Sequence, residues 1–423
     1  MLLLFYGSIL LIVFRVVEAK TTTQLQCKDE NDMPVDWYVL YKLPKIAESS
    51  IPSIRNGTAY LFITDKTAKV GWQLSTKNIG DSRSTPGNTL APLYNGNVNA
   101  TLWTLYNDNP PDAPSNPKYG HTKGVVMADD KQGLWLIHSV PNFPAYPNGG
   151  VQPRKRFSLQ NSSHDVSLID GRYGYPHSGL LNGQSFLCIS LGREQFNVVG
   201  KQLMYNQIIV YSRNIPTYLG EEYPVLKDAA NQVRVRDPPY NSKATIRSLG
   251  SLEFTSFAKS DKWQRDLYDD FVAPQLQSDL YVQTWLNGRG RLPTDCAGAK
   301  VYNVESLVLA AANVVFSSTR DHSKWAVTVE GRSNRNWVCV GDINRADTQY
   351  SRGGGTVCFK IFKVWTNYRN SVNDVEPSVK SDRATQTRAS RNWRYGLRAN
   401  TLSLRILSTH YKYSLFSVNR NER

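Results

Sequence analysis

Two segments of this chain resemble each other, and this internal repeat constrains the fold more than any other feature. Gly120 to Asn142 reads GHTKGVVMADDKQGLWLIHSVPN, and Asp321 to Asn344 reads DHSKWAVTVEGRSNRNWVCVGDIN. Each opens with His-x-Lys, continues into a short β-type run, a polar turn and a second run at a Trp, and ends on Asn. The His-to-Asn spacing is 142 − 121 = 21 in one segment and 344 − 322 = 22 in the other. The repeat predicts two related halves, each with a hairpin.

The spacing within each motif places its two side chains together. Residues i and i+2 of a strand point to the same face, so the histidine and lysine of each motif should project side by side. The returning strand of each hairpin brings its terminal Asn close to its own motif. Two halves packed face to face would surround one pocket with His121, Lys123, Asn142, His322, Lys324 and Asn344.

That set of residues suits phosphodiester cleavage without a metal or cofactor. Lysines neutralise the phosphoryl oxygens, and the Asn amides donate further hydrogen bonds. One neutral histidine attacks phosphorus to form a phosphohistidine, and the other, protonated, gives its proton to the leaving oxygen. A nearby ammonium lowers the pKa of the nucleophile, and the acid histidine loses its proton as pH rises. The pattern therefore predicts activity at acid pH.

Other patterns in the sequence are less specific. A lone His-x-Lys is common and usually lies on the surface, and His164, His177 and His410 fit solvated or core-edge positions better than a site. There is no phosphate-binding loop of the Walker type and no Cys-x-x-Cys pair for zinc. Gly353–Gly355 could approach a phosphate, but a turn is the default interpretation. Asp321 either orients His322 or caps a turn, and the turn is slightly favoured.

Net charge and processing signals place the chain outside the cytosol with a polyanionic partner. The net charge is +15 and the pI is about 9.5, which favours nucleic acid or an anionic surface. Residues 376–423 carry ten Lys/Arg against three Asp/Glu, so about half of the excess lies there. Residues 1–19 fit a signal peptide cleaved after Ala19, the alternative being an uncleaved anchor. No later stretch is apolar enough to span a membrane.

A secretory route permits glycans and disulfides. Acceptor triplets begin at Asn56, Asn99 and Asn161. The five cysteines are an odd number, so at least one of them cannot pair within the chain.

Local composition predicts a mixture of strands and helices. Strands are expected over 35–43 and 60–64, a proline-rich loop over 107–118, and helices over 264–277 and 305–314. This mixture indicates an α/β or α+β fold rather than a sandwich. Residues 376–423 lack clear periodicity until 402–407 and are expected to be a poorly ordered basic extension, with a DNA-binding arm as the alternative.

Several longer stretches carry a resemblance to a known family. They include PVDWYVLYKLP at 34–44, LYNDNPP at 105–111, GHTKGVVMAD at 120–129, WLIHSVPNFP at 135–144, GQSFLCISL at 183–191, GKQLMYN at 200–206, DHSKWAV at 321–327, CVGDINR at 339–345 and RGGGTVC at 352–358. Together they resemble the deoxyribonuclease II family over about residues 25–365.

The resemblance implies a fold of the phospholipase D type. Two α/β halves, at 20–215 and 216–375, would each hold a central sheet flanked by helices and share one active site across a pseudo-twofold axis. It further implies a lysosomal or secreted acid endonuclease that cuts double-stranded DNA without metal, leaves 3′-phosphate ends and clears DNA from dead or engulfed cells. No obligate protein partner is implied.

Residue by residue, the resemblance makes the two His-x-Lys pairs the active site. His138 matches a further family histidine near the site, and aligning the two halves places it opposite Val340. Which active-site histidine is the nucleophile stays open. A catalytically inactive member that binds DNA or a protein partner is one alternative, and a lipid phosphodiesterase is another.

The resemblance also bears on the cysteines. The family's second motif normally continues with Cys where this chain has Ala326, so Cys339 is expected to lack its partner. The bridges then implied are Cys27 to Cys188 and Cys296 to Cys358.

Overall fold

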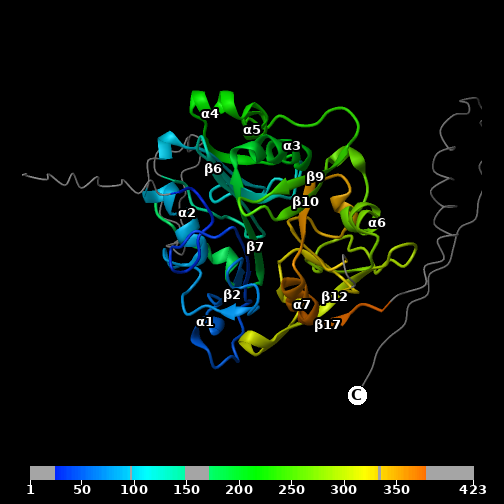
Figure 1. Cartoon of the computed structure of the whole chain (residues 1–423). Coiled ribbons are helices and arrows are strands. Elements are labelled where there is room, and N and C mark those ends of the chain that lie inside the picture. Colours follow the sequence, from blue (N-terminus) through cyan, green and yellow to red (C-terminus); the bar gives the residue numbers. More distant parts are fainter. Residues whose placement is uncertain (1–23, 96–97, 148–170, 332–334, 378–423) are drawn as a thin grey trace, which may run out of the picture. The chain divides into compact units, whose positions relative to one another are not determined.

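The computed structural model describes residues 24–95, 98–147, 171–331 and 335–377, and folds them around two β-sheets (Figure 1). The predicted signal peptide, Asn161, His164, His410 and residues 378–423 of the predicted tail lie outside the described residues. The first sheet has the strand order β3-β2-β1-β7-β6-β5-β4-β8. The second has the order β13-β12-β11-β14-β15-β16-β10-β9, with β17 also paired to β12.

The elements have the following bounds. Strands of the first sheet are β1 Trp37–Lys42, β2 Tyr60–Thr64, β3 Gln73–Leu74, β4 Leu102–Asn107, β5 Lys123–Ala128, β6 Gln132–His138, β7 Gln184–Gly192 and β8 Val210–Asn214. Strands of the second sheet are β9 Asn241–Arg247, β10 Glu253–Lys259, β11 Leu280–Gln283, β12 Val301–Leu309, β13 Val314–Ser317, β14 Trp325–Thr328, β15 Trp337–Gly341, β16 Gly354–Lys360 and β17 Val372–Val375. The helices are α1 Pro52–Arg55, α2 Thr85–Asn95, α3 Phe196–Asn206, α4 Thr217–Glu222, α5 Pro224–Ala230, α6 Ala273–Leu276 and α7 Phe362–Ser371, with a π-helical turn η5 at Tyr268–Val272.

Five neighbouring strands follow the same order in both sheets. The order β4-β5-β6-β7-β1 in the first sheet corresponds to β11-β14-β15-β16-β10 in the second, and every pairing in both sets is antiparallel. The sheets differ at the next strand, because β8 runs antiparallel to β4 whereas β12 runs parallel to β11. The two repeated sequence segments form the corresponding hairpins β5-β6 and β14-β15.

Strand register corrects the sequence alignment of the two halves by one residue. In the first hairpin Gly124 pairs with Ile137, and in the second Trp325 pairs with Val340. His138 therefore corresponds to Gly341 and not to Val340. The alignment was wrong because the Trp and Asn that anchored it are not at equivalent positions along the two returning strands.

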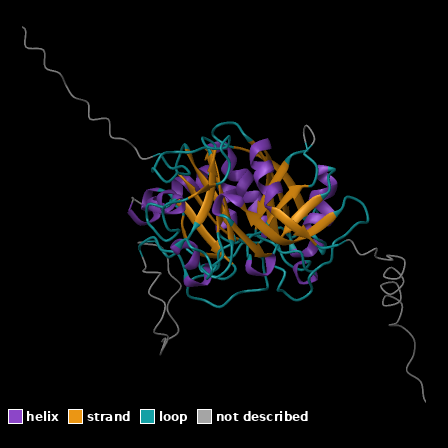
Figure 2. Cartoon of the chain, turned by 90° about the horizontal axis from the view of Figure 1, so that it is seen from below, coloured by secondary structure: helices purple, strands orange, loops and turns teal. Residues whose placement is uncertain are grey.

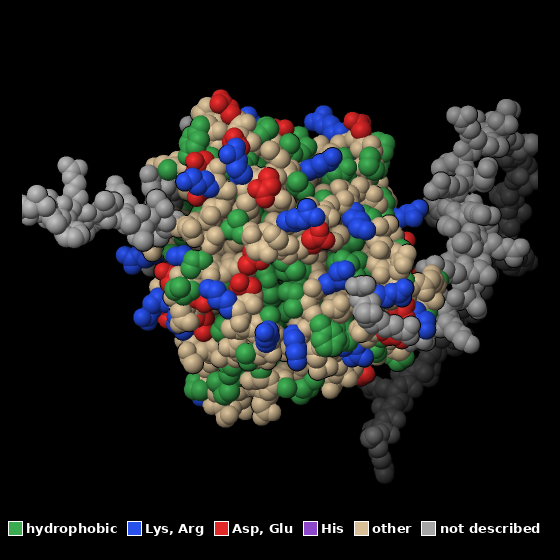
Figure 3. Space-filling model, in the orientation of Figure 1, with side chains coloured by type: hydrophobic (Ala, Val, Ile, Leu, Met, Phe, Trp, Pro, Cys, Tyr) green, Lys and Arg blue, Asp and Glu red, His purple; other side chains and the backbone are tan. Residues whose placement is uncertain are grey.

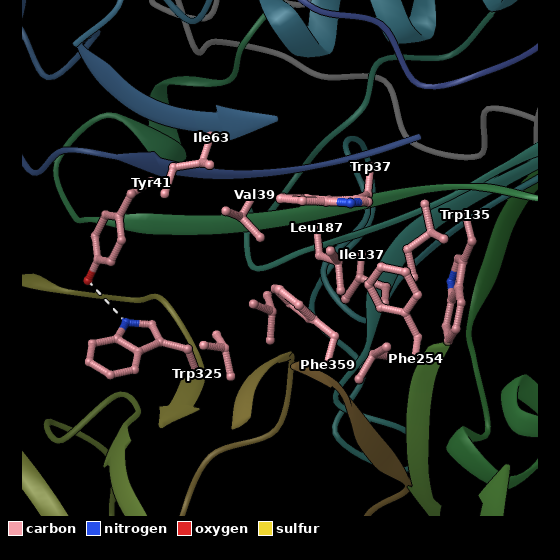
Figure 4. Close-up of a cluster of buried hydrophobic side chains, with 14 of the residues drawn as sticks. Trp37, Val39, Tyr41, Ile63, Trp135, Ile137, Leu187, Phe254, Trp325 and Phe359 are labelled. Carbon is pink, nitrogen blue, oxygen red and sulfur yellow. Dashed lines mark hydrogen bonds between the residues drawn. The ribbon is translucent and has the colours of Figure 1, made fainter. Parts of the chain in front are cut away.

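A central core lies between the two sheets. Trp37, Val39 and Leu187 of the first sheet pack with Phe254 and Phe359 of the second, and all five are at least 97% buried. The Trp37 and Phe359 rings are 5.9 Å apart (Figure 4). These side chains alternate along their strands, as expected for one face of a pleated sheet. The α+β class is confirmed, and within it the two sheets bury one face against each other.

The outer faces of the sheets have cores of their own. The opposite face of the first sheet packs with α2 through Leu90 and Leu93, and that of the second sheet packs with η5 and α6 through Phe271 and Leu276. Helix α3 packs against α5, where the backbone of Leu226 leaves no room for a Cβ at Gly200. Helices and loops therefore surround the strands, as Figure 2 shows from below.

Most of the predicted local elements are confirmed. The strand over 60–64 and most of the strand over 35–43 form β2 and β1, and the helix over 264–277 appears as η5 and α6. The predicted helix over 305–314 is wrong, since these residues end β12, make a short 3₁₀ turn at Ala310–Ala312 and begin β13. Their apolar run allows either structure, and pairing with β13 and β17 selects the strand.

One predicted disulfide is confirmed and the other is wrong. Cys27 bridges Cys188 as expected. Cys339, however, bridges Cys358 and leaves Cys296 without a disulfide. The reason lies in strand register: Cys339 lies between Ala326 on β14 and Cys358 on β16. With alanine on one side, the neighbour on the other side supplies the sulfur.

Two of the predicted glycan acceptors lie on the surface. Asn56 follows α1 and Asn99 lies in a short 3₁₀ turn, and both are exposed.

Within the described ranges, none of the helices combines the length and the apolarity that crossing a membrane requires. On the face drawn in Figure 3, Lys and Arg are scattered among Asp and Glu instead of forming one basic patch.

Candidate active site

The first motif lies where β5 begins. Lys123 is the first residue of β5 and pairs with Asn107 on β4. The backbone N–H of His121 donates to the carbonyl of Gly353, just ahead of β16, at 2.9 Å. This bond ties the first motif to the second sheet. Both motif side chains are buried, with His121 8% and Lys123 2% exposed.

A carboxylate and two residues of the second sheet surround the first motif. Asp108 accepts from Lys123 Nζ at 2.5 Å and from Arg352 Nη2 at 3.0 Å, and lies 4.0 Å from His121 Nε2. Gln349 Oε1 is 3.0 Å from His121 Nδ1. Burial favours a higher pKa for Asp108, but Lys123 and Arg352 outweigh it and lower the pKa. Asp108 is therefore a carboxylate shared by the cations of both halves.

The second motif lies at the start of β14 and mirrors the first in its backbone contacts. The N–H of His322 donates to the carbonyl of Gly183, just ahead of β7, at 2.8 Å. His322 Nδ1 is 3.1 Å from the carbonyl of Ser139, and Lys324 Nζ donates to the carbonyl of His322 at 2.5 Å. Each histidine thus donates its N–H to a glycine carbonyl of the other sheet.

Asp321 shapes the turn that enters the second motif. Its carboxylate accepts from the backbone N–H of Ser323 at 3.0 Å and from the Ser323 hydroxyl at 2.8 Å, and also from the Tyr41 hydroxyl. The preferred interpretation of Asp321 as a turn residue is confirmed. Tyr41 in turn receives a hydrogen bond from Trp325, which is drawn as a dashed line in Figure 4.

The two motifs lie close enough to influence each other electrostatically. The pKa of His121 is held well below 6.5 by burial and then by Lys123, Arg352 and Lys324. The pKa of His322 is likewise lowered by burial, then by Lys324, Lys123 and His121. Burial, followed by Lys123, also lowers the pKa of Lys324 well below its usual range. Each histidine is thus acted on by the lysines of both motifs.

His138 lies beside this site with one ring nitrogen unused. It ends β6, is fully buried, and packs against Phe143 and Phe186 with ring centroids 5.2 and 5.8 Å away. Nδ1 accepts the N–H of Val140 at 3.2 Å, and Nε2 has no partner in the described part of the chain. Burial and Lys123 lower its pKa well below 6.5. His138 is therefore a neutral ring with an Nε2–H donor.

The two asparagines of the repeat differ in their contacts. Asn142 donates its amide to the carbonyl of Pro110 at 2.8 Å, so its side chain holds the loop that follows Asp108. The side-chain oxygen of Asn344 accepts from the backbone N–H of Trp285 at 3.4 Å. The Trp285 ring lies against His322, with ring centroids 5.2 Å apart. Of the two, Asn344 has the more direct link to a motif histidine.

The three glycines at 353–355 do not form the turn that was the default interpretation. Gly354 and Gly355 begin β16. A Cβ on Gly353 would lie 2.4 Å from the carbonyl oxygen of Asn206, and one on Gly354 would lie 2.8 Å from Ile343. The glycines are needed for this close packing, which also places the Gly353 carbonyl beside His121.

Sequence reasoning missed the residues that make the two motifs unlike. Register places Asp108 and Trp285 at equivalent positions, two residues beyond Tyr106 and Gln283, which pair with Gly124 and Trp325. A carboxylate therefore flanks His121 where an indole flanks His322. Asp108 and Arg352 lie within LYNDNPP and RGGGTVC, two stretches of the family resemblance that fall outside the repeat, and no signal marked Gln349. Among the described residues, no group of three or more His, Cys, Asp or Glu is arranged to hold a metal ion.

A buried site with two His-x-Lys pairs, closed by contacts between two related sheets, has the groups required for phosphoryl transfer. Sequence comparison agrees with this class, since the family description Deoxyribonuclease II matches residues 26–378. Plancitoxin-1 of Acanthaster planci is 35% identical over 371 residues, covering 87% of this chain and 96% of that protein. Deoxyribonuclease-2-alpha of Mus musculus is 35% identical, covering 84% and 94%, and cell death-related nuclease 6 of Caenorhabditis elegans is 34% identical, covering 86% and 92%. This chain belongs to the deoxyribonuclease II family, whose members are hydrolases of the endonuclease type.

Proposed function

We propose that this protein is an acid endonuclease that hydrolyses double-stranded DNA without a metal ion, through a phosphohistidine intermediate, and leaves 3′-phosphate ends. The observation that carries the proposal is the pair of His-x-Lys motifs, in which His121, Lys123 and Lys324 are buried and His322 is half-buried. The backbone N–H of each histidine is hydrogen-bonded to a glycine at the edge of the other sheet. Lys123 and Lys324 supply the positive charge that a phosphodiester requires. His138 Nε2 and the Asn344 amide are proposed as further donors to the phosphate, whereas Asn142 holds a loop.

His322 is the proposed nucleophile. A carbonyl only accepts hydrogen bonds, so the Ser139 carbonyl fixes the proton of neutral His322 on Nδ1 and leaves a lone pair on Nε2. The pKa of His322 is lowered by burial and by both lysines, which keeps the ring neutral at mildly acid pH. Attack of Nε2 on phosphorus forms the N–P bond as the bond from phosphorus to the 5′ oxygen breaks.

His121 is the proposed general acid. Asp108 lies 4.0 Å from its Nε2, so a carboxylate faces the nitrogen that would carry the transferable proton. This proton passes to the departing 5′ oxygen, and neutral His121 then takes a proton from the water that hydrolyses the phosphohistidine. The products are a 5′ hydroxyl and a 3′ phosphate, and both histidines return to their starting states.

The lowered histidine pKa values give the proposal its pH dependence. His121 must be protonated to act as the acid, and burial and neighbouring cations hold its pKa well below 6.5. Its active form is therefore lost as pH rises toward neutrality. An enzyme of this kind works in an acid compartment, so we propose a lysosomal or secreted protein that degrades DNA from dead or engulfed cells.

The proposal includes a phospholipase D-like arrangement of two halves about a pseudo-twofold axis. The shared order of five strands and the reciprocal bonds from His121 to Gly353 and from His322 to Gly183 support it. Strands β1–β8 lie within the proposed N-terminal half, 20–215, and β9–β17 within the proposed C-terminal half, 216–375.

Nicking of supercoiled plasmid at about pH 5 in EDTA tests this function. We expect cleavage by the wild-type protein, 3′-phosphate ends, and a loss of at least ~10²-fold in His322→Ala. His177→Ala is the matched control, because His177 is exposed. Cleavage abolished by EDTA would refute the metal-free mechanism.

The same assay, run beside a phospholipid substrate under the same conditions, separates the alternative functions. A folded wild-type protein that binds plasmid without cutting it would be an inactive family member, and release of a phospholipid headgroup in place of nicking would indicate a lipid phosphodiesterase. The close relatedness to deoxyribonucleases over most of the chain favours the nuclease.

A further inference from the structure

Two buried lysines outside the His-x-Lys motifs occupy equivalent positions in the two sheets. Lys42 ends β1 and pairs with Gln184 on β7, and Lys259 ends β10 and pairs with Gly354 on β16. The two partners are equivalent, because each lies two residues before the strand position that pairs with His138 in one sheet and Gly341 in the other. Lys42 is fully buried and Lys259 is 1% exposed. Such burial is rare for lysine unless its ammonium is hydrogen-bonded.

Lys259 spends all three of its ammonium hydrogens on one loop. Its Nζ donates to the carbonyls of Gln349 at 2.8 Å, Tyr350 at 3.2 Å and Arg352 at 2.7 Å. The loop of residues 349–352 therefore closes around the Lys259 ammonium, and none of these residues belongs to a strand. Three donations to backbone carbonyls fix its path more tightly than a single bond would.

That loop supplies the contacts that the second sheet makes with the first motif. Gln349 contacts His121 Nδ1, and Arg352 donates to Asp108. The carbonyl of Gly353 receives the His121 N–H. Lys259 itself touches none of the motif side chains in these hydrogen bonds, so it acts on His121 through the loop.

Lys42 makes the corresponding contact in the first sheet. Its Nζ donates to the carbonyl of Leu180 at 2.8 Å. Leu180 is three residues before Gly183, as Tyr350 is three residues before Gly353. The carbonyl of Gly183 receives the His322 N–H, and a Cβ at Gly183 would lie 2.3 Å from Asp321 Oδ1. Lys42 therefore holds the loop of residues 180–183, and this loop contacts the second motif at His322 and Asp321.

We infer that Lys42 and Lys259 are a second pair of equivalent lysines that act as positioning residues, each fixing the histidine contributed by the opposite half. Lys259 positions His121, and Lys42 positions His322. The expected effect on catalysis rests on the proposed function. The assignment of each lysine to the histidine of the opposite half rests on the hydrogen bonds alone.

The test compares Lys259→Met and Lys42→Met with Lys243→Met. Lys243 is an exposed lysine on β9 and lies outside the loops at 180–183 and 349–352. With ¹³Cε1-labelled histidine, we expect Lys259→Met to move the NMR resonance of His121 but not that of His322. Lys42→Met should do the reverse, and Lys243→Met should move neither. On plasmid DNA, kcat should fall by ~10²-fold in both motif-linked variants with KM changed less than threefold, because a displacement of about 1 Å costs that much.

A second variant guards against loss of folding. If Lys259→Met fails to fold, Lys259→Gln, which keeps two N–H donors, carries the same NMR test, and Lys259→Arg should recover at least tenfold of the lost kcat. Equal movement of both histidine resonances, or of neither, would overturn the crossed assignment. The NMR result does not depend on turnover, so an inactive wild-type protein would refute the proposed function without deciding the positioning roles.

Discussion

The two His-x-Lys motifs make equivalent backbone hydrogen bonds, but different side chains lie beside their histidines. Each leads into the corresponding strand of its sheet, and the backbone N–H of its histidine donates to a glycine at the edge of the other sheet. Yet the equivalent position beside the histidine holds Asp108 in one half and Trp285 in the other. A repeated framework thus supplies the geometry twice, while single substitutions give one histidine an anionic neighbour and the other an aromatic one. The proposed mechanism rests on this difference when it gives the acid role to His121 and the nucleophile role to His322.

The largest effect should come from removing the carboxylate on one side only. Asp108→Asn takes away the negative charge shared by Lys123, Arg352 and His121, so we expect kcat to fall by ~10²-fold or more. The charged form of His121 loses support, so the alkaline limb of the pH–rate profile should move to lower pH.

Trp285→Phe is the matched change at the equivalent position. It keeps an aromatic ring beside His322, so the loss should stay under ~10-fold with the alkaline limb in place. Rates of plasmid nicking from pH 4 to 7 measure both variants. Equal losses and equal pH profiles in the two variants would remove the basis for unequal roles.

The two disulfides should differ in their contribution to stability. Cys27–Cys188 spans 161 residues and Cys339–Cys358 spans 19. Chain entropy predicts roughly 5 kcal/mol for the longer loop and roughly 3 kcal/mol for the shorter one. Thermal unfolding of Cys27→Ala/Cys188→Ala should therefore begin at a lower temperature than that of Cys339→Ala/Cys358→Ala. The reverse order would mean that native-state packing at β15-β16 outweighs loop length.

The smallest effect concerns Asp342, whose position in the second sheet is equivalent to that of Ser139 in the first. Burial raises the pKa of Asp342 to about 7, well above 3.8, because the charged carboxylate loses solvation. A raised folded-state pKa gives stability that is present below about pH 4 and lost as pH rises through 7. Asp342→Asn is neutral throughout, so its Tm relative to wild type should rise by ~2–4 °C between pH 4.5 and pH 7.5.

The exposed Asp374→Asn provides the control for that measurement. Its Tm relative to wild type should stay level across the same pH range. If Asp342→Asn followed the same flat course, the buried carboxyl would contribute nothing to the pH dependence of stability.

Sequence reasoning reached the motifs because the internal repeat is visible in the sequence alone. It singled out His121 with Lys123 and His322 with Lys324, and the lysines of both motifs act on each histidine. Strand alternation is not what places the pairs, because both histidines lie ahead of β5 and β14. The strands at 35–43 and 60–64 were equally accessible, since aromatic and β-branched residues favour pleated sheet.

The remaining features depend on contacts between residues far apart in the chain. Asp108 and Arg352 are 244 residues apart, and nothing local to either indicates that they meet. The pairing of Cys339 follows from which strand lies on each side of β15, which the cysteine spacing does not reveal. The helix expected over 305–314 became strand for the same reason, because neighbouring strands decided between two structures that its apolar run allows equally.

Cleavage of duplex DNA with a single 5′-bridging sulfur tests the unequal roles most directly. A thiolate leaves without a proton, so in a single turnover a variant that lacks only the general acid should recover the bond-breaking step on the sulfur substrate, whereas one that lacks the nucleophile should not. We predict that His121→Ala cuts the sulfur-substituted bond at least ~10²-fold faster than the normal bond, and that His322→Ala cuts neither. Rescue of His322→Ala with no rescue of His121→Ala would contradict the account and reverse the two roles.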